Sequence, residues 1–161
     1  MLPESEHKPL PHDLANSIAL CRRRRQFLAG LRQLYAAVDA DLARRSYECK
    51  ACGACCDFAK TGHRLHLSTG ELALLTEQPP PAAGTPSDRC PYQSGSTCTA
   101  HSRRALGCRV FFCDPASRDW SRQTYEAYHH HLRRLHEEHR LPYLYLELTA
   151  AVAELGGRTA R

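Results

Sequence analysis

The sequence has no apolar run long enough to cross a membrane and no pattern typical of a secretory signal. A membrane helix needs roughly 20 consecutive apolar residues, and here the apolar residues, 42% of the chain, form no such run. Residues 1–17 lack a basic stretch followed by an apolar one, so no signal peptide is predicted. These absences predict a cytoplasmic protein with no membrane partner, in a compartment where thiols stay reduced.

Motifs of the common enzyme classes are also missing. The chain has no glycine-rich phosphate loop, no Ser-His-Asp arrangement and no pair of acids at a suggestive spacing. It has no internal repeat either. Its length of 161 residues predicts one domain, residues 13–157, after a flexible N-terminus over residues 1–12.

Cysteine, in contrast, is abundant. Eight of the nine cysteines fall in one central stretch: Cys49, Cys52, Cys55, Cys56, Cys90, Cys98, Cys108 and Cys113. Thiolates at this density bind a soft metal or form disulfides. Because disulfides are rare in a reducing compartment, we predict that these eight residues are metal ligands. The ninth, Cys21, falls on an apolar helical stripe and is expected in the core.

The spacing of the first cysteines bears on the identity of the metal. Cys49, Cys52 and Cys55 follow the C-x-x-C-x-x-C pattern that begins a bacterial ferredoxin run. Cys56 departs from that pattern because it follows Cys55 directly. Side chains of neighbouring residues tend to diverge, so we expect these two to serve different ions, or only one of them to bind. Gly53 lies inside the run, where a backbone that wraps around a metal often needs a positive φ.

Structural zinc sites usually contain two separated C-x-x-C pairs, and this chain has no second pair downstream. The asymmetric spacing therefore favours an iron–sulfur cluster, with zinc as the alternative. Eight thiolates suit two four-thiolate sites, or one cluster plus a second site completed by another group. His101 is the histidine best placed to replace a thiolate, and a surface histidine is the alternative interpretation.

The formal net charge of +5 reflects 22 basic residues, mostly arginine, against 17 acids. Arg103, Arg104 and Arg109 lie near cysteines in the sequence and are expected to stabilise thiolate charge. The arginine run at residues 22–25 could bind nucleic acid. Aromatic residues are not interleaved with it, so we favour a solvated helix face and predict no nucleic-acid partner. A solvated face is also expected for the histidines of a later charged segment: His129, His130, His131, His136 and His139.

Apolar periodicity predicts a mainly α fold, with helices wrapped around an irregular cysteine-rich core at residues 46–116. Asp13 is positioned to cap the first helix. Ser68 and Glu71 form a predicted capping box at the start of a short helix. The longer predicted helices lie at residues 13–45, 117–139 and 143–155, so that residues 13–45 and 117–155 flank the core.

The cysteine-rich segment resembles the YkgJ-type cysteine-cluster family, whose signature is CxxCxxCC and whose members are described as zinc- or iron-chelating. The signature matches the run from Cys49 to Cys56. The downstream family pattern matches Cys90, Cys98, His101, Arg104, Cys108, Arg109 and Phe111, with Ala105 where the family usually has proline. The resemblance covers residues 46–116. It implies a module that binds a metal or a cluster, and it leaves zinc and iron open.

Together these features predict a metal-binding protein that holds an iron–sulfur cluster or zinc. Its expected role is that of a redox, sensor or metal-handling accessory with an unidentified protein or redox partner. Two alternatives stay open from the sequence. One is a cluster-dependent enzyme of the oxidoreductase or methyl-transfer type, and the other is a zinc-stabilised nucleic-acid binder that uses the arginines at residues 22–25.

Overall fold

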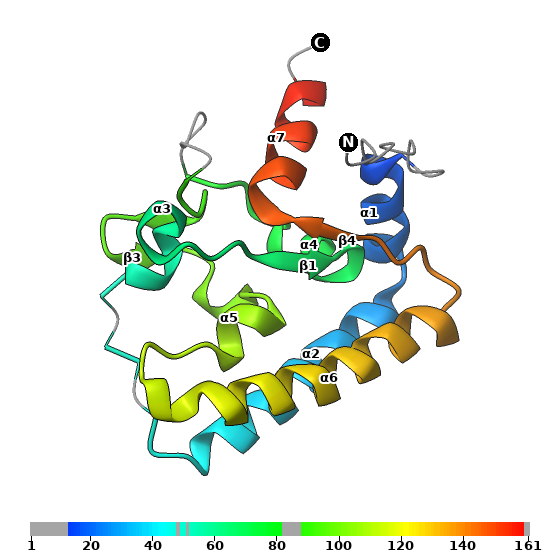
Figure 1. Cartoon of the computed structure of the whole chain (residues 1–161). Coiled ribbons are helices and arrows are strands. Elements are labelled where there is room, and N and C mark those ends of the chain that lie inside the picture. The colour runs from blue at the N-terminus through cyan, green and yellow to red at the C-terminus, as the bar shows by residue number, and fades with distance from the viewer. Residues whose placement is uncertain (1–12, 48, 51, 82–87, 160–161) are drawn as a thin grey trace, which may run out of the picture.

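The computed structural model describes residues 13–47, 49–50, 52–81 and 88–159, and the N-terminal segment predicted to be flexible lies outside them. The described chain is mainly helical, which confirms the predicted mainly α class (Figure 1). The α-helices are α1 (Leu14–Arg23), α2 (Arg25–Ala43), α3 (Phe58–Thr61), α4 (Thr69–Leu75), α5 (Leu106–Val110), α6 (Arg118–Glu138) and α7 (Leu148–Thr159). The strands are β1 (His66–Ser68), β2 (Gln93–Ser94), β3 (Thr97–Cys98) and β4 (Tyr145–Glu147). The 3-10 turns are η1 (Ala54–Cys56), η2 (His101–Arg103) and η3 (Pro115–Ser117).

The first predicted helix is two helices in the structure. Arg24 separates α1 from α2 with φ −89° and ψ 84°, outside the helical region, so the prediction of one helix over residues 13–45 is wrong at this point. The break lets α1 pack on α4 while α2 packs on α6. Arg22 helps to hold the first contact, because its Nε donates to the carbonyl of Ala73 at 3.1 Å. Asp13 caps α1 as predicted, accepting from the backbone N–H of Ala15.

Helices α2 and α6 lie side by side and run in opposite directions (Figure 1). α6 confirms the helix predicted over residues 117–139 within one residue at each end. The two helices and α5 enclose a cluster of buried apolar side chains: Leu31, Tyr35, Val38, Leu74, Leu106, Val110 and Leu132. This packing fixes α5, which carries Cys108, against the α2–α6 pair.

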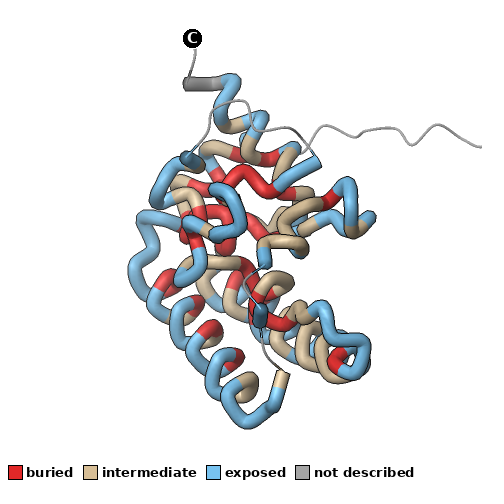
Figure 2. The backbone as a smooth tube through the Cα atoms, turned by 90° about the vertical axis from the view of Figure 1, so that its left-hand side faces the viewer, coloured by how far each residue is buried: buried red, intermediate tan, exposed pale blue. Residues whose placement is uncertain are grey.

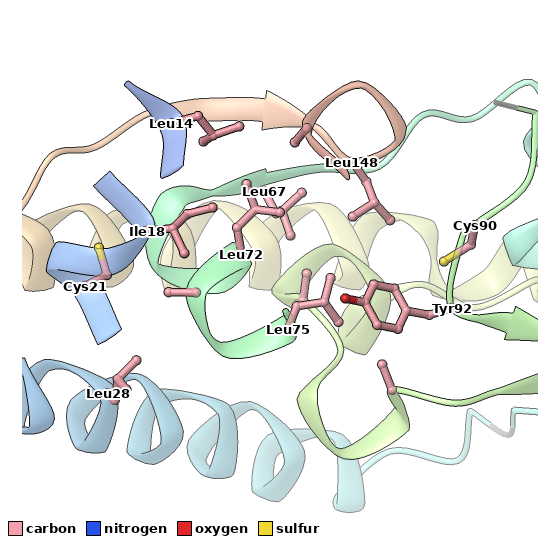
Figure 3. Packing of buried hydrophobic residues seen from close by; sticks show 14 of the residues in the cluster. Leu14, Ile18, Cys21, Leu28, Leu67, Leu72, Leu75, Cys90, Tyr92 and Leu148 are labelled. Carbon is pink, nitrogen blue, oxygen red and sulfur yellow. The ribbon is translucent and has the colours of Figure 1, made fainter. Parts of the chain in front are cut away.

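A second core joins both ends of the chain. β1 pairs antiparallel with β4, with Ser68 opposite Tyr145, so the last predicted helix begins at Leu148 rather than at residue 143. The predicted capping box of Ser68 and Glu71 is present at the start of α4. Figure 3 shows apolar side chains of α1, α4, β1 and α7 meeting in this core, with Cys21 fully buried as predicted.

The cysteine-bearing segments lie at one side of these helices, on short turns and a two-stranded hairpin (Figure 1). Buried residues concentrate on the inward sides of the helices, as Figure 2 shows. Within the described chain, no helix is both long enough and apolar enough to cross a membrane.

Candidate metal centre

The first cysteines lie on a tight turn built around Gly53. Its φ is +71°, which confirms the predicted positive φ, and η1 follows it directly. The site is also crowded, since a Cβ at Gly53 would lie 2.7 Å from Gln93 Nε2 and 2.9 Å from the carbonyl oxygen of Ser96. Gln93 Nε2 donates to the carbonyl of Gly53 at 2.9 Å. Only glycine meets both requirements, so this turn depends on it.

The hairpin formed by β2 and β3 brings later cysteines to this turn. The backbone N–H of Cys90 donates to the carbonyl of Cys56 at 2.9 Å. Beside it, Arg89 and Asp57 form an ion pair at 3.2 Å. Gln93 and Arg89 support the site but could not be predicted from the sequence, because short irregular segments carry no periodic signal that pairs distant residues.

Four cysteines from the two ends of the segment form what we call the outer group: Cys49, Cys52, Cys55 and Cys113. The thiol of Cys113 is hydrogen-bonded to that of Cys52. Burial and the neighbouring thiols of Cys52, Cys55 and Cys49 raise the pKa of Cys113. All four side chains are exposed. Cys113, the last cysteine of the chain, therefore lies near the first three cysteines of the central segment.

The other four form what we call the inner group: Cys56, Cys90, Cys98 and Cys108. Cys56 is hydrogen-bonded to Cys90 and lies near Cys98. Burial, followed by the thiols of Cys56, Cys55 and Cys98, raises the pKa of Cys108 to about 12. Cys90 is buried and the other three are partly buried. This group is the less accessible of the two.

Cys55 and Cys56 connect the two groups. Their thiols are hydrogen-bonded to each other, and this bond is the largest contribution raising the pKa of Cys55. These neighbouring thiols lie close together, and the expectation that they serve different ions, or that only one of them binds, stays a prediction. The bond lowers the pKa of Cys56, but the bond to Cys90, burial and other thiols outweigh it and raise that pKa to about 12.

Arg104 supplies positive charge near the thiols, as predicted for it. The charge of Arg104 acts to lower the pKa of both Cys55 and Cys108. Among the described residues, no hydrogen-bond partner meets the buried Nε of Arg104, or the buried Nε and Nη2 of Arg103. A buried donor nitrogen without an acceptor is unfavourable. A set of metal-bound thiolates, which is negatively charged, would compensate the one on Arg104.

Arg109 has a different role from the one predicted. Its guanidinium is 4% exposed and donates to Asp39 at 2.7 Å and 2.9 Å. It lies 4.1 Å from the ring centroid of Tyr35. These contacts direct Arg109 to α2 rather than to the thiols.

His101, the histidine predicted as a substitute ligand, is exposed. The charged groups that act on it are Arg104, Arg109 and Asp39, so no thiol is among the causes of its lowered pKa.

The histidines of α6 do not all lie on a solvated face. His136 is 0% exposed. Its ring contacts those of Phe27 and Tyr143 edge-on, at centroid distances of 4.8 Å and 5.2 Å. The prediction is wrong for this residue, because its position on the 3.6-residue helical period faces α1–α2 and the segment after α6.

The eight thiols are chemically suited to bind a metal, but their sulfur atoms are not arranged around a common metal position. In the part of the chain that the structure describes, no three Cys, His, Asp or Glu side chains are arranged to hold a metal ion. The thiols are nevertheless neighbours within two groups, and Arg104, whose buried Nε has no acceptor among the described residues, acts on Cys55 and Cys108. Metal binding would have to draw the thiols together, as is common where binding and folding are coupled.

Comparison with known proteins adds no assignment. No family model, curated protein or solved structure matches this chain. The resemblance to the YkgJ-type family therefore stays a prediction.

Proposed function

We propose that this chain is a metal-binding protein with two thiolate sites, one formed by the outer group and one by the inner group. The observation that carries the proposal is the grouping of all eight central cysteines, which come from distant parts of the sequence, into two sets of neighbouring thiols. Four thiolates are a complete ligand set for a zinc ion or for an iron–sulfur cluster.

An iron–sulfur cluster is the favoured occupant, and zinc is the alternative. The spacing of Cys49, Cys52 and Cys55 supports the cluster, as does the positive charge of Arg104 between the two groups. A bound cluster would supply one-electron redox chemistry. The protein's own residues would supply the thiolates and the compensating charge of Arg104. This chemistry suits a redox, sensor or metal-handling accessory in the reducing cytoplasm, acting on a protein or redox partner.

The two sites are proposed to differ in role. The outer group is exposed, so a chelator, an oxidant or a partner protein could reach its metal directly. The inner group includes the buried Cys90, whose backbone N–H is bonded to Cys56. Metal there would join the first cysteine run to the hairpin and to α5. We therefore assign exchange or electron transfer to the outer site and structural stabilisation to the inner one.

The test compares single Cys→Ser variants, purified without oxygen, by metal and sulfide content per chain. Cys113→Ser should remove the metal of the outer site and leave the inner site filled. Cys90→Ser should lose inner metal and destabilise the fold. Cys21→Ser is the matched control, because Cys21 is fully buried and lies at the opposite end of the core from Cys90 (Figure 3). Equal metal content in all three variants and the parent chain would contradict the proposal.

A further inference from the structure

A cavity of about 390 Å³ lies between the end of α2 and the first half of α6. Its lining combines two arginines, an acid, an indole and several small polar groups: Asp41, Arg44, Arg45, Trp120, Gln123, Thr124, Ala127 and Tyr128. Sites for small organic ligands typically have volumes of about 300–1,000 Å³ and a few convergent polar groups. None of the cysteines or their supporting residues lines this cavity.

The single acid of the cavity is already engaged. Asp41 Oδ1 pairs with Arg44 at 3.5 Å, and Oδ2 accepts a hydrogen bond from the hydroxyl of Tyr128. Burial, together with the bond to Asp41, raises the pKa of Tyr128 to about 12, so this hydroxyl stays a donor at neutral pH. The negative charge of Asp41 is thus largely compensated within the wall of the cavity.

Arg45 is the arginine of the cavity whose charge is not compensated by an acid of the cavity wall. Its guanidinium lies 5.8 Å from the ring centroid of Trp120, and among the described residues no ion pair involves it. A guanidinium held over an aromatic face keeps its N–H groups available at its edge, where they can bind two oxygens of a carboxylate or phosphate. Arg45 and the exposed Arg44 therefore give one end of the cavity a net positive charge.

Trp120 is held in position from its other sides. Its ring lies 5.5 Å from that of Tyr47 and 6.2 Å from that of Phe112, measured between centroids. Phe112 directly precedes Cys113 in the sequence. The aromatic trio thus fixes one wall of the cavity and connects it to the segment that carries a cysteine of the outer group.

We propose that this cavity binds a small organic anion that presents a phosphate or carboxylate to Arg44 and Arg45. The organic body of the ligand would lie along Trp120, Gln123 and Thr124, where an amide and a hydroxyl offer hydrogen bonds. The cavity is much larger than a single inorganic anion, so the anion alone would leave most of it filled by water. This binding does not depend on the proposed metal function.

The experiment uses the full chain and the fluorescence of Trp120, the only tryptophan in the sequence. The probes are adenosine 5′-monophosphate, phenyl phosphate, benzoate and inorganic phosphate, titrated at low ionic strength with calorimetry as a second readout. We expect a saturable change with at least one organic anion and much weaker binding of inorganic phosphate. Tighter binding of the phosphate esters would identify a phosphate ligand, and tighter binding of benzoate would identify a carboxylate ligand.

Arg45→Ala should weaken this binding by about tenfold or more, as expected for loss of a charge-assisted bidentate contact. Arg44→Ala should weaken it less, because Arg44 already shares its charge with Asp41. The matched control is Arg134→Ala, which removes an exposed arginine of α6 that pairs with Glu138 and should leave binding unchanged. The proposal is overturned if no organic anion binds saturably, if Arg45→Ala binds as well as the parent chain, or if inorganic phosphate binds as tightly as its esters.

Discussion

The guanidinium of Arg109 donates to both carboxylate oxygens of Asp39, at 2.9 Å and 2.7 Å. It also donates to the backbone carbonyls of Arg104 and Ser102, at 3.0 Å and 2.7 Å. One side chain thereby ties the turn before α5 to α2. Because Cys108 precedes Arg109 in the same short helix, this contact also fixes where Cys108 lies.

Loss of the Arg109 contact should destabilise the fold strongly. We expect Arg109→Ala to lower the free energy of unfolding by about 2–3 kcal/mol, because it removes the donor from the half-exposed Asp39 and from two partly buried carbonyls. Arg109→Lys keeps the charge but not the planar fork, and should still lose part of this stability. Urea unfolding measures both. Arg32→Ala is the control, since its exposed pair with Glu77 should contribute less than about 1 kcal/mol. Equal effects at the two arginines would contradict this account.

Two glycines with nearly the same backbone conformation allow two costs of a substitution to be measured separately: the cost of a positive φ and the cost of a Cβ that contacts its neighbours. Gly53 has φ +71° and Gly62 has φ +69°, but only Gly53 has neighbours where a Cβ would be placed. Gly62→Ala should cost about 1–2 kcal/mol from its positive φ alone. Gly53→Ala should cost more and should also lower the metal content per chain. Unfolding curves and metal analysis test this pair, and normal metal content in Gly53→Ala would argue against a role for the turn.

Burial of His136 predicts a loss of stability in mild acid. Burial, with a smaller contribution from the nearby His139, lowers the pKa of His136 from 6.5 to about 4. A lowered histidine pKa means that the folded state favours the neutral ring. Its stabilising contribution is therefore full above pH 6.5 and is lost as the pH falls from 6.5 towards 4. The loss should reach about 3 kcal/mol.

The variant His136→Leu should remove most of this pH dependence. Tyr143 also packs against His136, and burial is the main cause that raises its pKa to about 12, so it stays neutral throughout this range. Unfolding measured at pH 7 and at pH 4.5 gives the comparison. His130→Leu is the control, because His130 is exposed on the same helix. An unchanged pH profile in His136→Leu would show that other groups cause the acid sensitivity.

The difference in exposure between the two thiol groups predicts two rates of metal loss. A chelator added without oxygen should remove the metal of the exposed outer group first and that of the inner group more slowly. Cys113→Ser should abolish the fast phase and leave the slow one. A single phase in the parent chain, or a fast phase that survives in Cys113→Ser, would contradict the assignment of roles.

Local signals in the sequence were sufficient for several features. α6 follows from an uninterrupted apolar stripe, and Asp13 and the Ser68–Glu71 pair act as caps through bonds to residues close in the chain. Gly53 could be anticipated because a tight turn between cysteines needs a positive φ. In each case the stabilising interaction lies within a few residues of the feature that it determines.

The features that sequence analysis missed depend on contacts between distant segments. The break at Arg24 reflects packing of α1 on α4 and of α2 on α6, which no local propensity encodes. β4 exists because β1 pairs with it. Arg109 turns towards Asp39 because a buried guanidinium needs acceptors, and that acceptor lies on a helix far away in the sequence. The grouping of the cysteines likewise depends on contacts between segments that are distant in the sequence.

The most direct test of the central proposal is the visible spectrum of the protein purified without oxygen, recorded together with its iron, zinc and acid-labile sulfide content. The account predicts a coloured protein with matched iron and sulfide, bound by thiolates of the outer and inner groups. Stoichiometric zinc in a colourless protein would keep the two thiolate sites but replace the cluster. A chain that contains neither metal, and that takes up neither iron nor zinc on reconstitution, would contradict the account.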